Sequence, residues 1–162
     1  EGVPTIVQSN GAIKPDRNHP ESADNARLIA DVTRRRDADD APEVIIIEGL
    51  MTLYLPEVRA LLDLRLFVDL PPDLRALRRM LRHLHHLPVE PDLADRMDDA
   101  MLYFTECARR GHALYVEPSK EYADLVLRGD ADLARTASLI GDLVRGRLAR
   151  RQPQPSSITA SR

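Results

Sequence analysis

The chain has 162 residues, of which 43% are hydrophobic and 30% are charged, and its formal net charge is -3. This length is enough for one domain with a core, and the composition is typical of a globular protein. The acidic net charge argues against nucleic acid and acidic membranes as partners, and no apolar run approaches the roughly 20 residues of a membrane span. The single cysteine, Cys107, excludes an internal disulfide framework and indicates a reducing, cytoplasmic compartment.

The first part of the chain predicts a strand, a turn and a helix. Residues 3–8 have the composition of a strand, and Asn10-Gly11 is a turn signal. Asn18 can cap a helix whose first turn contains Pro20, and this helix is expected to extend to about residue 36.

A second strand is predicted at residues 44–48, where four β-branched side chains follow one another. Such a run is typical of a strand buried on both faces of a parallel sheet. The run ends on Glu48 and Gly49, and ligands bind where the strands of such a sheet end. Glu48 is therefore a candidate ligand of Mg²⁺, which is usually held by one or two carboxylates, waters and phosphates. The alternative is that Glu48 only ends the strand ahead of a turn.

The remainder of the chain predicts helices that alternate with two further strands. From the spacing of apolar residues, helices are expected at 53–62, 72–84, 93–110 and 132–148, and strands at 64–68 and 123–127. Residues 85–91 are expected to form a loop, and Gly111 is expected to end the helix before it. Alternating strands and helices predict an α/β fold with a parallel sheet. Residues 1–150 are expected to form one domain and residues 151–162 a disordered tail.

The helix after Pro72 places basic side chains on one face, opposite its leucines. The members of this arginine stripe are Arg75, Arg78, Arg79 and Arg82. Like charges at the spacing i, i+3, i+4 repel by roughly 0.2–0.5 kcal/mol per pair, so the stripe is better tolerated when an anion faces it. Guanidinium groups match phosphate oxygens, which makes the stripe a candidate phosphate site. The alternative is a solvated basic face that nearby Asp and Glu side chains balance.

The histidine cluster and the single cysteine are expected to have ordinary structural roles. His83, His85 and His86 lie close together in the sequence, but no cysteine or acidic residue is spaced with them for a zinc site. Cys107 falls inside a predicted helix and is expected to be a buried thiol rather than a nucleophile.

Three blocks of the sequence resemble the uridine kinase and phosphoribulokinase family of P-loop kinases. They read NHPESADNARLI, EVIIIEGLMTLYLPEVRALLDLRLFVDLPPDLRALRRMLRH and YVEPSKEYADLVLRG, and the likeness spans residues 3–148. The resemblance implies a three-layer P-loop kinase-like fold, with a parallel sheet flanked by helices. It also implies phosphoryl transfer from ATP, with Mg²⁺, to a hydroxyl of a nucleoside or related small molecule. Members of the family often self-associate, which leaves a homo-oligomer open.

The resemblance also implies roles for individual residues. Glu48 is similar to the family's magnesium-associated carboxylate, and the arginine stripe is similar to the arginines that meet nucleotide and substrate phosphates. Asn10 falls where the family usually has an Asp that accepts the substrate hydroxyl proton. Asn18, followed by His19, falls where an Asp holds the ribose hydroxyls of a nucleoside.

The sequence departs from the family at several of these positions. Both expected Asp residues are Asn10 and Asn18 here, and an amide is not a useful general base. No G-x-x-x-x-G-K-S/T motif occurs in the 162 residues. The P-loop and the family's central first strand are therefore expected upstream of Glu1, and these residues alone are expected to show negligible turnover. The alternative prediction is a non-catalytic relative whose fold survives as a binding or assembly module.

Overall fold

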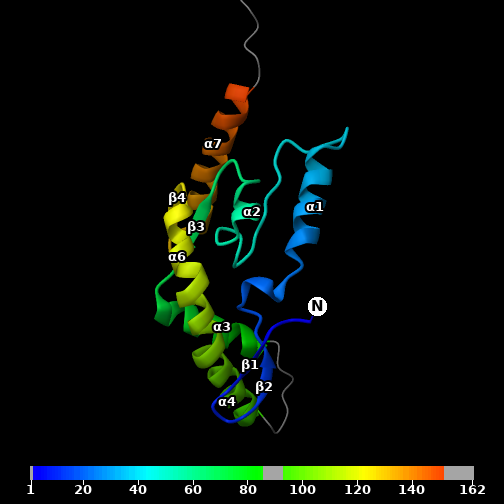
Figure 1. Cartoon of the computed structure of the whole chain (residues 1–162). Helices are drawn as coiled ribbons and strands as arrows, with labels where there is room; N and C mark the ends of the chain where they lie inside the picture. Colours follow the sequence, from blue (N-terminus) through cyan, green and yellow to red (C-terminus); the bar gives the residue numbers. More distant parts are fainter. Residues whose placement is uncertain (1, 86–92, 152–162) are drawn as a thin grey trace, which may run out of the picture. The chain divides into compact units, whose positions relative to one another are not determined.

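The structure, a computed structural model, describes residues 2–85 and 93–151 (Figure 1). Its internal contacts divide the chain into two units, Glu1–Gly129 and Asp130–Arg162. The first unit contains two small sheets and a long helical stretch, and the described part of the second is dominated by α7 (Leu133–Arg151). None of the described helices combines the length and apolar composition needed to cross a bilayer.

A β-hairpin opens the first unit. Strands β1 (Thr5–Val7) and β2 (Ile13–Pro15) pair antiparallel, with Thr5 opposite Pro15. The turn between them needs a glycine, because Gly11 has a φ of 82°, a conformation that other residues rarely adopt. The predicted strand and the Asn10-Gly11 turn are confirmed, whereas β2 was not predicted.

The predicted helix over residues 18–36 is divided into two parts. A 3₁₀ turn, η1 (Pro20–Ser22), precedes α1 (Asn25–Arg36), and the chain between them is extended at Ala23. The Asp24 side chain caps α1 by accepting a hydrogen bond of 2.9 Å from the Arg27 backbone N–H. His19 caps η1 in the same way, accepting from Glu21. The prediction that Asn18 is the cap is therefore wrong, because two later side chains satisfy the helix ends.

The strand predicted at residues 44–48 does not form. This segment is irregular, and Figure 1 draws it without an arrow. A strand requires a neighbouring chain to pair its backbone groups, and no backbone hydrogen bond joins residues 43–48 to another described residue. Its apolar side chains consequently reach the surface, and Ile46 is 86% exposed.

The second sheet is a parallel pair. Strands β3 (Leu66–Asp69) and β4 (Leu125–Arg128) pair in register, with Leu66 opposite Leu125 and Asp69 opposite Arg128. Both strands lie close to their predicted positions. Among the described residues this is the only parallel pairing, so the predicted three-layer arrangement around a larger sheet stays a prediction. The helix predicted at 72–84 is confirmed as α3 (Pro72–His85), whereas the helix predicted at 53–62 is shorter, with only α2 (Pro56–Arg59) helical.

One helical stretch extends without a break from residue 93 to residue 122. Its parts are α4 (Leu93–Tyr103), η2 (Phe104–Ala108), α5 (Arg109–Gly111), η3 (His112–Val116), α6 (Glu117–Ser119) and η4 (Lys120–Tyr122). Both η2 and η3 are π-helical, and they flank Gly111. The prediction that Gly111 ends a helix is wrong. Gly111 is buried inside the stretch, at a point where the helix approaches the backbone of Asn18.

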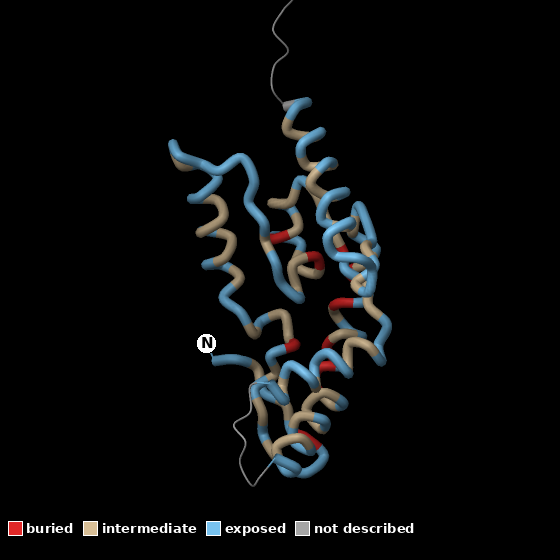
Figure 2. Tube along the Cα trace, turned by 180° about the vertical axis from the view of Figure 1, so that it is seen from behind, coloured by how far each residue is buried: buried red, intermediate tan, exposed pale blue. Residues whose placement is uncertain are grey.

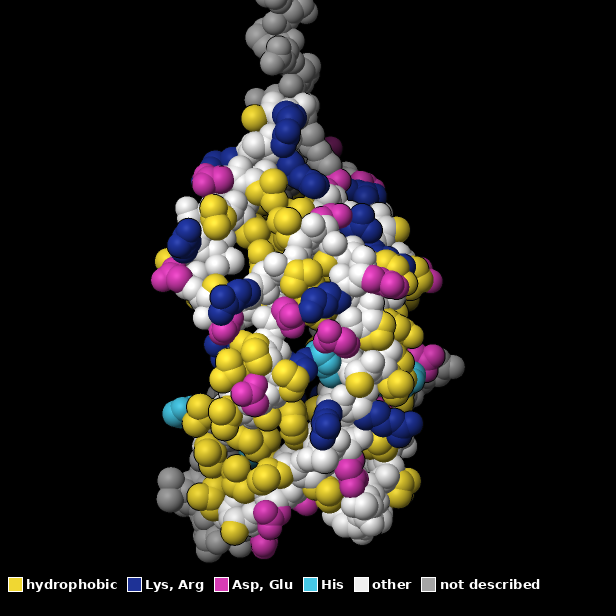
Figure 3. All heavy atoms as spheres, turned by 90° about the vertical axis from the view of Figure 1, so that its left-hand side faces the viewer, with side chains coloured by type: hydrophobic (Ala, Val, Ile, Leu, Met, Phe, Trp, Pro, Cys, Tyr) yellow, Lys and Arg dark blue, Asp and Glu magenta, His cyan; other side chains and the backbone are white. Residues whose placement is uncertain are grey.

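The buried core of the first unit is small, as the few buried positions in Figure 2 show. Leu53, Phe67 and Val116 form its centre, with Val58 and Cys107 buried elsewhere. The predicted burial of the Cys107 thiol is confirmed. The leucine face of α3 is open, since Leu77 is 59% and Leu81 55% exposed. Hydrophobic side chains also gather on the face of the molecule drawn in Figure 3.

Two predictions fall mainly outside the described residues. Residues 86–92 include most of the expected loop and His86, and residues 152–162 include nearly all of the expected tail. Both stay predictions.

Candidate functional site

Arginines of the stripe on α3 contact different neighbouring groups. Arg75 contacts Nε2 of His112, and Arg78 donates a hydrogen bond of 3.0 Å to the Gly129 carbonyl. Arg79 lies 5.8 Å from the centre of the Tyr103 ring, a cation–π contact. Within residues 2–85 and 93–151, no carboxylate forms an ion pair with any arginine of the stripe, Arg82 included. The alternative of a face balanced by acidic side chains is supported only at Arg75, whose charge helps to lower the pKa of the nearby Asp69 carboxyl.

Arg75 belongs to a cluster of charged groups at the C-terminal end of β3. Lys120 donates a hydrogen bond of 2.6 Å to Asp69, and it lies 3.9 Å from Glu117. The hydrogen bond from Lys120 lowers the pKa of Asp69, and the same bond raises the pKa of Lys120. Burial, followed by the nearby Arg75 charge, lowers the pKa of His112. The cluster therefore ties α3 and the long helical stretch to the end of the sheet.

The Asp69–Lys120 pair leads to a prediction about pH. Because the pKa of Asp69 is lowered, its contribution to stability is present above the ordinary carboxyl pKa and is lost as the pH falls through the lowered value. We expect Lys120→Met to reduce the free energy of unfolding at neutral pH, and this loss to shrink on acidification. Urea unfolding at a series of pH values measures it. The matched control is Lys14→Met, whose more exposed partner Asp99 lies 3.3 Å away. An equal loss for Lys120→Met at neutral and acidic pH would contradict the prediction.

The loop between β2 and η1 is held against the long helical stretch at two points. The Tyr103 hydroxyl donates to the Pro15 carbonyl and accepts from the Arg17 N–H and the Asn18 amide, at 3.0, 3.1 and 3.3 Å. Further along the helix, Gly111 lies so close to Asn18 that a side chain at this position would collide with it. Asn18 is only 6% exposed as a result. Its amide is therefore engaged in packing the loop rather than open to a ligand.

Asn10 is engaged in a similar way, within the hairpin turn. Its side-chain oxygen accepts a hydrogen bond of 3.0 Å from the Ala12 N–H. The preceding residue, Ser9, donates a hydrogen bond of 2.9 Å from its backbone N–H to Glu106. Hydrogen bonds from Ser9, first from its side chain and then from its backbone, lower the pKa of the Glu106 carboxyl. Asn10 thus supports the turn, and an amide in this position offers no base.

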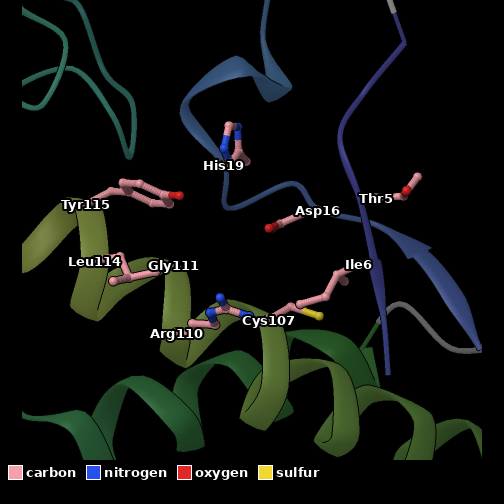
Figure 4. A pocket seen from close by; sticks show the side chains of 9 residues that line it. All are labelled: Thr5, Ile6, Asp16, His19, Cys107, Arg110, Gly111, Leu114 and Tyr115. Carbon is pink, nitrogen blue, oxygen red and sulfur yellow. The ribbon is translucent and has the colours of Figure 1, made fainter. Parts of the chain in front are cut away.

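A cavity of about 280 Å³ opens between this loop and the helical stretch (Figure 4). The loop contributes Asp16 and His19, and the helix contributes Cys107, Arg110, Gly111 and Tyr115. The Tyr115 ring packs edge-on against the His19 ring, with centroids 5.5 Å apart. Burial raises the pKa of the Cys107 thiol, so this side chain is a neutral part of the wall.

Asp16 and Arg110 give the cavity its charge. The Asp16 carboxylate accepts a hydrogen bond of 3.0 Å from the Asn18 N–H, which leaves its second oxygen for another donor. Neither Asp16 nor Arg110 forms an ion pair within the described residues. A carboxylate and a guanidinium that line one small cavity without pairing can bind a ligand that both donates and accepts hydrogen bonds.

Glu48 lies in the irregular segment, where it is exposed and makes no hydrogen bond or ion pair with another described residue. The described residues contain no group of three or more His, Cys, Asp or Glu side chains that could together hold a metal ion. A single open carboxylate still fits Mg²⁺, because this ion takes most of its ligands from water and phosphates. No contact among the described residues brings Glu48 to the arginine stripe, so its role stays a prediction.

Sequence reasoning placed two candidates, Asn18 and His19, in this loop but missed Asp16, Arg110 and Tyr115. Asp16 was identifiable as the only carboxylate of the segment between Asn10 and His19. Arg110 and Tyr115 carry no such signal, because their nearness to Asp16 depends on how the helix packs on the loop.

Comparison with known proteins identifies a family and several relatives that the chain resembles. Residues 8–133 match the Phosphoribulokinase / Uridine kinase family. A uridine kinase of Chlamydia pneumoniae is 29% identical over 135 residues, covering 70% of this chain and 58% of the relative. A uridine kinase of Clostridium botulinum (strain Okra / Type B1) is 27% identical over the same length, covering 63% of the relative. A third, from Bacillus cytotoxicus, is 38% identical over 88 residues, which are 52% of this chain and 37% of the relative.

The matched region contains most of the features described above. It includes the β2–η1 loop, the arginine stripe, most of the cavity lining and both strands of the parallel pair. The chain spans about three fifths of the length of the first two relatives. The resemblance inferred from the sequence is confirmed, and the chain belongs to the phosphoribulokinase and uridine kinase family.

Proposed function

We propose that the protein containing this chain transfers the γ-phosphoryl group of ATP to a hydroxyl of a nucleoside or a related small molecule. The observation that carries the proposal is the family match over residues 8–133, together with relatives that are named uridine kinases. In such a transfer, the bond from the γ-phosphorus to the bridging oxygen of ADP breaks and a bond to the acceptor oxygen forms. The protein mainly positions the reactants and stabilises charge.

The arginine stripe supports this proposal because none of its guanidinium groups forms an ion pair with a carboxylate in the described chain. Arg82 makes no hydrogen bond or ion pair there, and Arg78 and Arg79 contact only a carbonyl and a ring. Guanidinium groups without acidic partners are suited to phosphates, which they bind through parallel hydrogen bonds. We assign the stripe to the phosphates of the nucleotide. Glu48 would hold Mg²⁺, which supplies neutralisation of phosphate charge when bound.

ATP binding and turnover test the proposal. The assay measures ADP release by the natural full-length protein with Mg²⁺ and uridine as the first acceptor. We expect Arg82→Gln to weaken ATP binding about tenfold, since a hydrogen bond to a charged group contributes roughly 1.5–3 kcal/mol. The matched control is Arg34→Gln in α1, an exposed arginine that pairs with Asp31 and is expected to leave ATP affinity unchanged. Failure of the full-length protein to bind ATP at millimolar concentration would contradict the proposal.

A second candidate function is a non-catalytic binding or assembly module. It is favoured by the two amides at positions where relatives of this kind are expected to have acids: Asn10 supports a turn and Asn18 is packed against Tyr103. Asn10→Asp distinguishes the two functions, because an aspartate retains the oxygen that accepts from Ala12. Turnover that appears only in this variant would indicate a degenerate enzyme, whereas turnover in the unchanged protein would exclude the non-catalytic function.

A further inference from the structure

His112 contacts one member of the arginine stripe near the end of the parallel pair of strands. Its ring nitrogen Nε2, in the long helical stretch, faces the Arg75 guanidinium of α3. Both side chains are partly buried there, whereas Arg78, Arg79 and Arg82 are exposed. Arg75 therefore has less freedom than the other arginines of the stripe. It lies close to the last residue of β3, the edge at which parallel sheets bind ligands.

The contact between His112 and Arg75 requires a neutral imidazole. A guanidinium group only donates hydrogen bonds, so Nε2 of His112 must offer its lone pair and the ring proton must lie on Nδ1. A protonated imidazole has two N–H donors and a positive charge, and it would repel the guanidinium. The neutral ring uses one of the five guanidinium donors, which leaves the others for phosphate oxygens.

The groups around His112 keep its imidazole neutral near pH 7. Burial lowers the pKa of His112, and the Arg75 charge lowers it further. Two carboxylates oppose these effects: Glu117 of α6, with an oxygen 3.9 Å from Nδ1, and Asp69 of β3. Lys120 of η4 lies 2.6 Å from Asp69 and 3.9 Å from Glu117, and it offsets part of their charge. The ring therefore takes up a proton only at a pH below its ordinary pKa.

We propose that His112 is a positioning residue for the phosphate site: it holds the Arg75 guanidinium at the end of β3, where this side chain binds a phosphate of the nucleotide. An arginine that is already held loses less conformational freedom when a ligand binds, so the contact raises the affinity for phosphate. The inference rests on the proposed function for the identity of the ligand, but it concerns nucleotide binding and not phosphoryl transfer. It also makes the affinity depend on pH, because protonation of His112 releases Arg75.

Two substitutions of His112 separate this role from packing alone. His112→Gln retains an oxygen that can accept from Arg75 and cannot take up a proton, whereas His112→Phe retains a ring without an acceptor. Calorimetric titration measures ATP binding to the natural full-length protein without an acceptor, and circular dichroism checks the fold. At neutral pH we expect His112→Phe to weaken ATP binding by about three- to tenfold. His112→Gln is expected to bind ATP nearly as the unchanged protein does.

Acidification gives a second measurement on the same proteins. The terminal phosphate also takes up a proton in this pH range, so the affinities are compared as ratios at each pH. We expect the affinity ratio of the unchanged protein to His112→Phe to fall to one or below as the pH drops through the lowered pKa of His112. The ratio of His112→Gln to His112→Phe is expected to stay constant. The matched control is His85→Gln, an exposed histidine of α3 whose replacement is expected to change neither the affinity nor its pH dependence.

The outcomes distinguish the inference from the proposed function. Equal ATP affinity of His112→Phe and the unchanged protein at neutral pH would overturn the inference and leave the proposed function intact. Equal losses in His112→Gln and His112→Phe would also overturn it, because packing alone would explain them. Absence of ATP binding would overturn both. Conversely, ATP binding that depends on His112, in a protein that transfers no phosphoryl group to uridine, would support the inference while the proposed function fails.

Discussion

Gly111→Ala is expected to destabilise the first unit by about 2 kcal/mol or more, because it forces a side chain into a contact that is already closed. A Cβ atom at this position would lie 2.5 Å from the Asn18 Cβ and 2.7 Å from the Asn18 carbonyl oxygen. The second of these atoms belongs to the backbone, so the loop or the helix must move as a whole. The higher helix propensity of alanine, about 1 kcal/mol, offsets only part of this cost. Urea unfolding followed by circular dichroism measures the change.

The control for Gly111→Ala is a glycine in a helix with open space around it. Gly146 lies in α7, and a Cβ atom there would meet nothing within 4 Å. Gly146→Ala is therefore expected to stabilise α7 by roughly 0.5–1 kcal/mol. If Gly111→Ala were also stabilising, the close approach of the helix to Asn18 would be wrong, and the cavity that depends on this packing would lose its helical wall.

Phe67→Ala is expected to cost about 3–5 kcal/mol of unfolding free energy, the usual range for removing a buried aromatic ring. Phe67 is 7% exposed and packs with Leu53 and Val116 in the small core of the first unit. The Lys120 ammonium lies 5.6 Å from the centre of its ring, so the substitution also removes a cation–π contact. Because few other residues are buried, neighbouring side chains cannot compensate for the lost ring.

Val68→Ala serves as the comparison, since Val68 is the next residue of β3 and is 63% exposed. Successive side chains of a strand point to opposite faces, and we expect this change to stay within about 0.5 kcal/mol. Thermal and urea unfolding of both variants measure the difference. Similar losses for Phe67→Ala and Val68→Ala would mean that β3 buries neither face preferentially.

Local sequence signals account for much of the secondary structure. The Asn10-Gly11 turn was predictable because one side-chain oxygen and one glycine at positive φ are sufficient to form it. The helix after Pro72 and the strand ending at Asp69 were predictable from apolar spacing and from proline at a helix start. These features depend on residues within a few positions of one another, and the same blocks of sequence carried the family resemblance.

Other features depend on residues that are distant in the sequence. The β-branched run at 44–47 has strong strand propensity, yet a strand requires a partner for its backbone groups, and the described chain provides none there. A glycine such as Gly111 is typical of a helix end. In the structure it instead allows the helix to approach the loop at Asn18. Propensity describes what a segment can do, and the neighbouring segments decide what it does.

The same distinction between local sequence signals and contacts of distant residues applies to the candidate site. By itself, the sequence determined the family, the arginine stripe on one helix face and the amides at positions 10 and 18, because each of these is a matter of residue type and spacing. Only the tertiary structure decided that Asn18 is buried under Tyr103 and that Asp16 and Arg110 line one cavity. The physical reason is that a helix and a loop meet there through packing contacts, and neither segment encodes the position of the other.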